Sequence, residues 1–70
     1  MAPDYALMSR LVRKHKAALT RAKKVGPGAV MVACDKALSD FDDHGYPDNW
    51  HLWQMARYDA EVALRRSGAL

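Results

Sequence analysis

The sequence has only one cysteine, Cys34, among its 70 residues. A disulfide within the chain is therefore excluded, and one thiol without a secretory signal is typical of a protein in a reducing cytoplasm. The N-terminal stretch MAPDYALMSR lacks the apolar core of a signal peptide. No apolar run approaches the roughly 20 residues that span a membrane. We therefore expect a cytoplasmic protein that does not contact a membrane.

Signatures of catalysis are also missing. The sequence has no glycine-rich phosphate loop, no nucleophile elbow and no paired carboxylates in an evident cleft. Cys34 and His15 both fall on apolar helical stripes, which favours buried structural side chains over a nucleophile and a base. A chain this short also leaves little volume for an ordinary substrate pocket. We expect a non-enzymatic protein that uses no cofactor.

Glycine and proline are few, and they divide the chain into three segments. Gly26 with Pro27, then Gly45 with Pro47, end the first two segments, and Gly68 ends the third. The segments are rich in residues that favour helix, and none alternates with a period of two. The sequence predicts one all-α domain over residues 1–70, a three-helix bundle with helices at about 4–24, 29–43 and 48–66. Short connections make its topology up-down-up.

Each predicted helix carries an apolar stripe at helical spacing. The stripe of the first helix comprises Met8, Leu11, Val12, His15, Ala18, Leu19 and Ala22. The stripe of the second comprises Val30, Ala33, Cys34, Ala37, Leu38 and Phe41. The third has a main face of Trp53, Ala56, Ala60, Ala63 and Leu64, with Trp50 and Leu52 at its edges. Asp4 and Asp48 are the expected N-caps of the first and third helices.

The third helix has a second apolar stripe, well separated from its main face. It consists of His51, Met55, Tyr58 and Val62, which recur at i, i+4, i+7 and i+11 and so form one line. A three-helix bundle needs one broad apolar face per helix. The second stripe is therefore either internal, if the third helix lies centrally, or a binding surface. We expect a surface that binds another protein or a second copy of the chain, which would give a homodimer.

Charge is distributed unevenly along the chain. Residues 1–25 hold seven basic residues and one acidic residue, whereas residues 26–70 hold four basic and seven acidic residues. Five of the cations share one face of the first helix, opposite its apolar stripe: Arg10, Arg13, Lys14, Arg21 and Lys24. Such a face either only interacts with solvent or follows the phosphates of a nucleic acid without reading its sequence. Sequence-independent nucleic-acid binding is therefore the alternative function.

The segment DFDDHGYPDNWH, residues 40–51, partly resembles an EF-hand calcium loop. Asp40, Asp42, Gly45 and Asp48 fall at the first, third, sixth and ninth positions of that loop. His51 replaces the bidentate glutamate at the twelfth position, so a hard cation loses its strongest ligand. The alternative transition-metal ligands, His44 and His51 with Asp42 or Asp43, have no recurring ligand spacing. We expect no metal site here.

The same segment is better explained as a corner between two helices. Tyr46, Trp50 and Trp53 are expected to close the end of the core, with their polar tips reaching water. Asp42 and Asp43 lie near a helix C-terminus, where the helix macrodipole disfavours negative charge. These two carboxylates are therefore candidates for recognising a lysine or arginine of a partner.

The stretch GYPDNWHLWQMARYDA, in an alanine- and arginine-rich chain, resembles uncharacterised small helical proteins of actinobacteria and their phages. The resemblance implies a phage protein that acts by binding a host macromolecule. It assigns a role to no individual residue.

Overall fold

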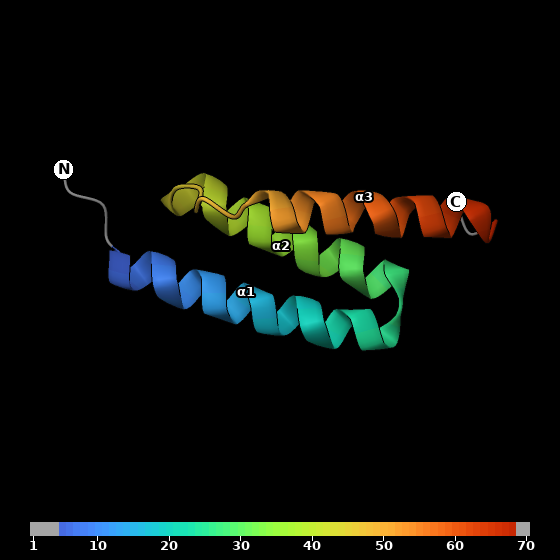
Figure 1. The fold of residues 1–70 in the computed structure, drawn as a ribbon, viewed down its shortest axis with the longest axis horizontal. Helices are drawn as coiled ribbons and strands as arrows, with labels where there is room; N and C mark the ends of the chain where they lie inside the picture. Colours follow the sequence, from blue (N-terminus) through green and yellow to red (C-terminus); the bar gives the residue numbers. More distant parts are fainter. Residues whose placement is uncertain (1–4, 69–70) are drawn as a thin grey trace.

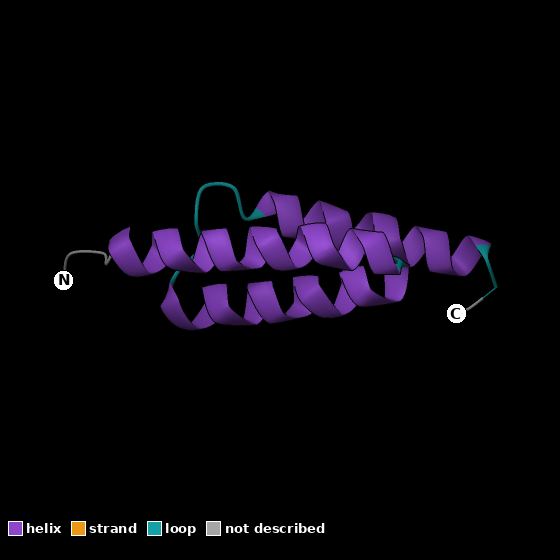
Figure 2. Ribbon diagram, turned by 90° about the horizontal axis from the view of Figure 1, so that it is seen from below, coloured by secondary structure: helices purple, strands orange, loops and turns teal. Residues whose placement is uncertain are grey.

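The computed structural model describes residues 5–68, and these contain three α-helices. They are α1 (Tyr5–Val25), α2 (Pro27–His44) and α3 (His51–Arg66). The described residues include no strand. The helices run up, down and up in an elongated bundle 47 Å long (Figures 1 and 2). The predicted all-α three-helix fold is confirmed.

A single residue, Gly26, connects α1 to α2. Its φ of 151° is one that side chains of L-residues rarely adopt, and its amide donates to the Ala22 carbonyl at 3.0 Å, which closes α1. Pro27 then starts α2, where its missing N–H leaves no helical hydrogen bond unmade. The second helix therefore begins two residues before the predicted position, because Pro27 opens this helix as well as ending the previous one.

The second corner contains Gly45, whose φ of 107° again favours glycine and whose amide donates to the Phe41 carbonyl at 2.7 Å. Residues 48–50 form a turn in which the Trp50 amide donates to the buried Pro47 at 3.1 Å. This turn delays the start of α3 to His51. No side chain caps α3, so the prediction of Asp48 as its N-cap is wrong. Asp4, the other predicted cap, lies outside the described residues.

The central helix of the bundle is α2. It packs extensively against both neighbours, whereas α1 and α3 contact each other sparsely (Figure 1). Three of the four core residues with no exposed surface, Cys34, Ala37 and Phe41, come from α2. The alternative in which the third helix lies centrally is therefore wrong. Small side chains along α2 allow a helix to approach on each flank.

An aromatic cluster joins the three helices. The Phe41 ring of α2 meets His15 of α1 at a centroid distance of 5.6 Å and Trp53 of α3 at 4.9 Å, both edge to face. Trp53 is fully buried, and its indole N–H donates to the His15 carbonyl at 3.4 Å. The expectation that its polar tip reaches water is wrong, because the side chain points inward toward α1. Tyr46 and Trp50 pack edge to face beside Phe41, with Tyr46 half-exposed.

Polar contacts at two carboxylates of α2, Asp40 and Asp35, join the outer helices to it. The buried His15 places its Nε2 2.6 Å from the Asp40 Oδ2, and Lys14 Nζ lies 3.9 Å from the same oxygen. The hydrogen bond from His15 is the main reason that the pKa of Asp40 is lowered. On the other flank, Arg57 Nε donates to Asp35 Oδ1 at 2.7 Å. These contacts therefore link α1 and α3 to different flanks of α2.

Candidate protein-binding surface

The second stripe of α3 faces away from the bundle. Trp53 and Ala60, on the opposite side of the helix, are buried. Met55 and Tyr58 are 66% and 65% exposed, His51 is also exposed, and Val62 is partly buried. The structure therefore leaves the three N-terminal residues of the predicted stripe on the surface. The His51 ring stacks on Trp50 at a centroid distance of 3.8 Å, which holds it at the start of the stripe.

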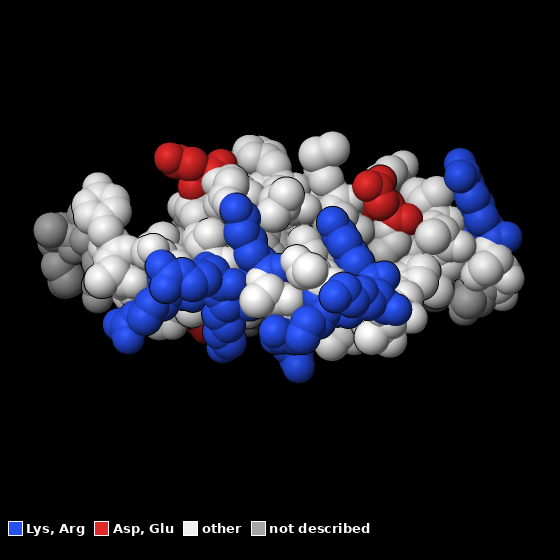
Figure 3. All heavy atoms as spheres, turned by 60° about the horizontal axis from the view of Figure 1, so that its bottom comes forward, with Lys and Arg blue, Asp and Glu red and all other residues white. Residues whose placement is uncertain are grey.

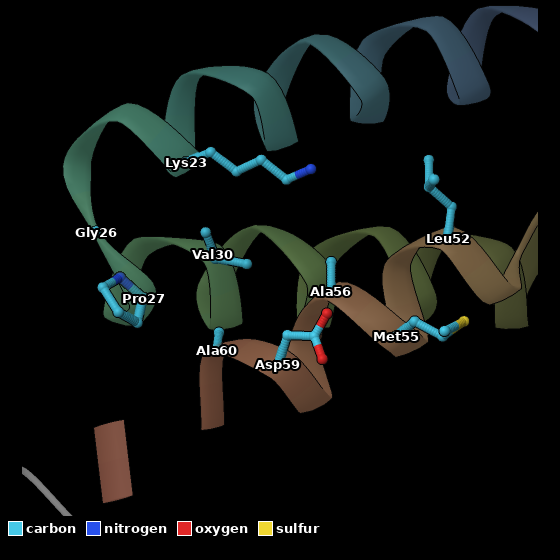
Figure 4. Close-up of a pocket in the computed structure, with 9 residues that line it drawn as sticks. All are labelled: Lys23, Gly26, Pro27, Val30, Leu52, Met55, Ala56, Asp59 and Ala60. Atoms are coloured by element: carbon cyan, nitrogen blue, oxygen red, sulfur yellow. The ribbon is translucent and has the colours of Figure 1, made fainter. Parts of the chain in front are cut away.

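A groove of about 490 Å³ runs between α1 and α3, beside the stripe (Figure 4). Its floor is apolar and small, with Val30 from α2 and Ala56 and Ala60 from α3. Gly26 and Pro27 lie at one end, and Leu52 and Met55 line the α3 side. Met55 therefore belongs to both the stripe and the groove. The groove exists because α1 and α3 each pack on α2 and not closely on each other.

Two opposite charges line this groove. Lys23 extends from α1 and Asp59 from α3 (Figure 4), and no ion pair joins them in the part of the chain that the structure describes. Lys23, Val30 and Asp59 were not predicted from the sequence as site residues. A signal was nevertheless present, because Leu52 and Ala56 lie on the side of the main face that borders the second stripe, and Asp59 continues the same line along α3.

The predicted basic face lies along α1. Its five residues, Arg10, Arg13, Lys14, Arg21 and Lys24, are all exposed, and Lys and Arg side chains gather over this helix (Figure 3). The helix contains no acidic residue. Within residues 5–68, Lys14 alone among the α1 cations forms an ion pair, with Asp40. Most of the positive charge on this face is therefore unpaired.

The acidic corner between α2 and α3 does not gather its carboxylates. Asp40 points to His15, whereas Asp42 accepts a hydrogen bond from the Tyr46 hydroxyl, which raises the pKa of Tyr46. Asp43 and Asp48 are exposed and form no ion pair with any described residue. Over residues 5–68, no three His, Cys, Asp or Glu side chains are arranged to hold a metal ion.

The two residues considered for catalysis both lie in the core. Cys34 has no exposed surface, and its burial raises the pKa of the thiol. His15 is 4% exposed and takes part in the contact with Asp40. Both side chains are buried, as their positions on the apolar stripes indicated.

None of the described helices combines the length and the apolar character required to cross a membrane.

Comparison with known proteins gives no relative for this chain. No protein-family model matches it, and neither a curated protein nor a solved structure matches.

Proposed function

We propose that this protein acts without catalysis or a cofactor, by binding another protein through the exposed stripe of α3. The observation that carries the proposal is the exposure of Met55 and Tyr58 on the side of α3 that faces away from the core. Methionine and tyrosine are enriched at protein interfaces, where they supply adaptable apolar contact and a polar tip. Covering them would remove apolar area from water at about 25 cal/mol per Å².

The partner is either a different protein or a second copy of the chain. A two-fold pair would place α3 antiparallel to its mate, with Tyr58 near the centre of the contact. The resemblance of the sequence to small proteins of actinobacteria and their phages supports a host protein as the target of a phage-encoded modulator. A protein of that kind would work in the cytoplasm.

Aspartate substitutions test this proposal. Met55→Asp and Tyr58→Asp should each abolish capture of partners from a native host extract, and any self-association seen by analytical ultracentrifugation. Val32→Asp is the matched control, because Val32 is 55% exposed on α2 and outside the stripe. Far-UV circular dichroism should show unchanged helix in all three variants. Retention of every wild-type contact by folded Met55→Asp and Tyr58→Asp would refute the proposal.

The second candidate function is sequence-independent nucleic-acid binding through α1. It is favoured by the unpaired positive charge along this helix, where Lys14 alone forms an ion pair with a described residue. About five phosphate contacts would give a log–log salt slope near −4 to −5 for duplex DNA. Charge reversal at Arg10, Lys14 and Arg21 should abolish that binding, whereas Arg66→Glu on α3 should not. Absence of duplex binding at about 50 mM salt would eliminate this candidate.

A further inference from the structure

We infer that the groove between α1 and α3 is a docking site for an α-helix of a partner protein whose apolar face is flanked by acidic residues. This inference rests on the proposed function, because it names the class of partner and a surface next to the stripe.

The groove has the shape that a helix requires. Its two sides are helices, and its floor consists of the buried Val30 and Ala60 with the partly buried Ala56. Small floor residues let a further helix approach closely, and Leu52, 43% exposed, offers an apolar contact on the α3 side. A helix seated there would touch both α1 and α3 and complete a four-helix bundle.

The charge on the α1 side selects an acidic flank. Lys23 lines the groove and forms no ion pair with a described residue. Lys16, two turns earlier, lies on the same flank of α1 and is exposed. Because α1 has no acidic residue, an acidic flank on the occupant would supply the countercharge for both lysines. On the opposite side, Asp59 would face a neutral or basic flank, and this asymmetry sets which way the occupant is rotated.

A second copy of the chain does not provide such a helix. α1 has no acidic residue, and the apolar face of α2 is buried in the core. The exposed stripe of α3 is bordered by Arg65 and Arg66 as well as by Asp59 and Glu61. Each flank of this stripe therefore carries a basic as well as an acidic residue, and Glu61 already forms an ion pair with Arg65 at 3.1 Å. No described helix combines an exposed apolar face with a flank that is acidic only, so the occupant belongs to a different protein.

A displayed peptide library tests the inference on the full chain. The peptides have about 18 residues, or ~27 Å of helix, with apolar residues at i, i+3, i+4 and i+7 and flanking positions varied among Glu, Gln and Lys. Selection should enrich Glu on one flank. For the selected peptide, Lys23→Glu should weaken binding about ten-fold or more, and changing the facing Glu of the peptide to Lys should restore it. Lys36→Glu is the matched control, because Lys36 is exposed on α2 and does not line the groove.

Other outcomes separate this inference from the proposed function. Enrichment of Lys flanks, no preference between flanks, or no binder at all would overturn the docking site. If the Tyr58→Asp variant no longer binds the selected peptide but the Leu52→Asp variant still does, the peptide binds the stripe. The proposed function would then stand and the inference of a docking groove would fail. Loss of peptide binding in both Leu52→Asp and Lys23→Glu supports the groove. This holds even if Tyr58→Asp still captures all native partners, a result that would refute the stripe as an interface.

Discussion

Replacing Trp53 with alanine is expected to unfold the domain. The side chain has no exposed surface, and its ring meets Phe41 at a centroid distance of 4.9 Å. A tryptophan buries about 150–250 Å², which corresponds to about 4–6 kcal/mol at ~25 cal/mol per Å². Measured losses for aromatic-to-alanine changes in cores are about 3–5 kcal/mol. A domain of this size has a total free energy of unfolding of about 3–5 kcal/mol, so the expected loss from Trp53→Ala is as large as this total stability.

The second tryptophan supplies the matched control. Trp50 is only partly buried in the corner, where it packs against Tyr46 at 5.7 Å, so Trp50→Ala should cost about 1–2 kcal/mol and leave a folded protein. Trp53→Phe keeps an aromatic ring but loses the N–H that reaches the His15 carbonyl, so it should cost about 1–2 kcal/mol. This variant gives a measurable midpoint even if Trp53→Ala is unfolded from the start.

Urea denaturation followed by far-UV circular dichroism measures all three variants. A wild-type midpoint for Trp53→Ala, or a larger loss for Trp50→Ala than for Trp53→Ala, would refute the assignment of the core. Either result would mean that the junction of the three helices is not where the structure places it.

Three further results are expected. The hydrogen bond from His15 lowers the pKa of Asp40, so the carboxylate stabilises the fold above the unfolded pKa of about 3.9, and this contribution is lost as pH falls through the folded pKa. Asp40→Asn should therefore lower the urea midpoint at neutral pH. A difference in midpoint between Asp40→Asn and the wild type that persists at about pH 2 would contradict the sign. Gly45→Ala should cost about 1–2 kcal/mol because the φ of Gly45 is 107°. Gly28→Ala lies inside α2 with open space at its Cβ and should stabilise the fold by about 0.4–1 kcal/mol. Equal shifts of the melting temperature in the two variants would contradict this. Because Cys34 is buried and the pKa of its thiol is raised, a disulfide reagent should label it far faster in urea than in buffer, and equal rates would place the thiol at the surface.

Much of the fold could be predicted from the positions of glycine and proline. Gly26 and Gly45 adopt backbone angles that most residues avoid, so each marks a helix end in the sequence itself. The start of α3 was harder to predict, because the turn over residues 48–50 depends on hydrogen bonds with i to i+3 spacing that no cap residue announces. Asp48 looks like a cap in the sequence and lies instead within this turn.

The positions of the helices relative to each other could not be predicted in the same way. Periodicity shows which residues share a face, and it placed His15 and Cys34 in the core and three of the four residues of the α3 stripe on the surface, whereas Val62 is partly buried. It does not show which helix is central, because that depends on crossing angles and on contacts such as His15 with Asp40, 25 residues apart. The groove follows from the central position of α2. Sequence spacing alone therefore could not predict that Lys23 and Asp59 line its two sides.

The central position of α2 also has a consequence for how fast the chain folds. Extensive packing occurs only between helices that follow each other in sequence, so the bundle is two helical hairpins that share α2. Each hairpin closes over a short connection, and chains dominated by such local contacts fold in about microseconds to milliseconds. The hairpins use different flanks of α2, with Asp40 toward α1 and Asp35 toward α3, so neither blocks the other. Folding can therefore begin at either end of the chain, and the Phe41 ring, which contacts both outer helices, is where the two routes converge.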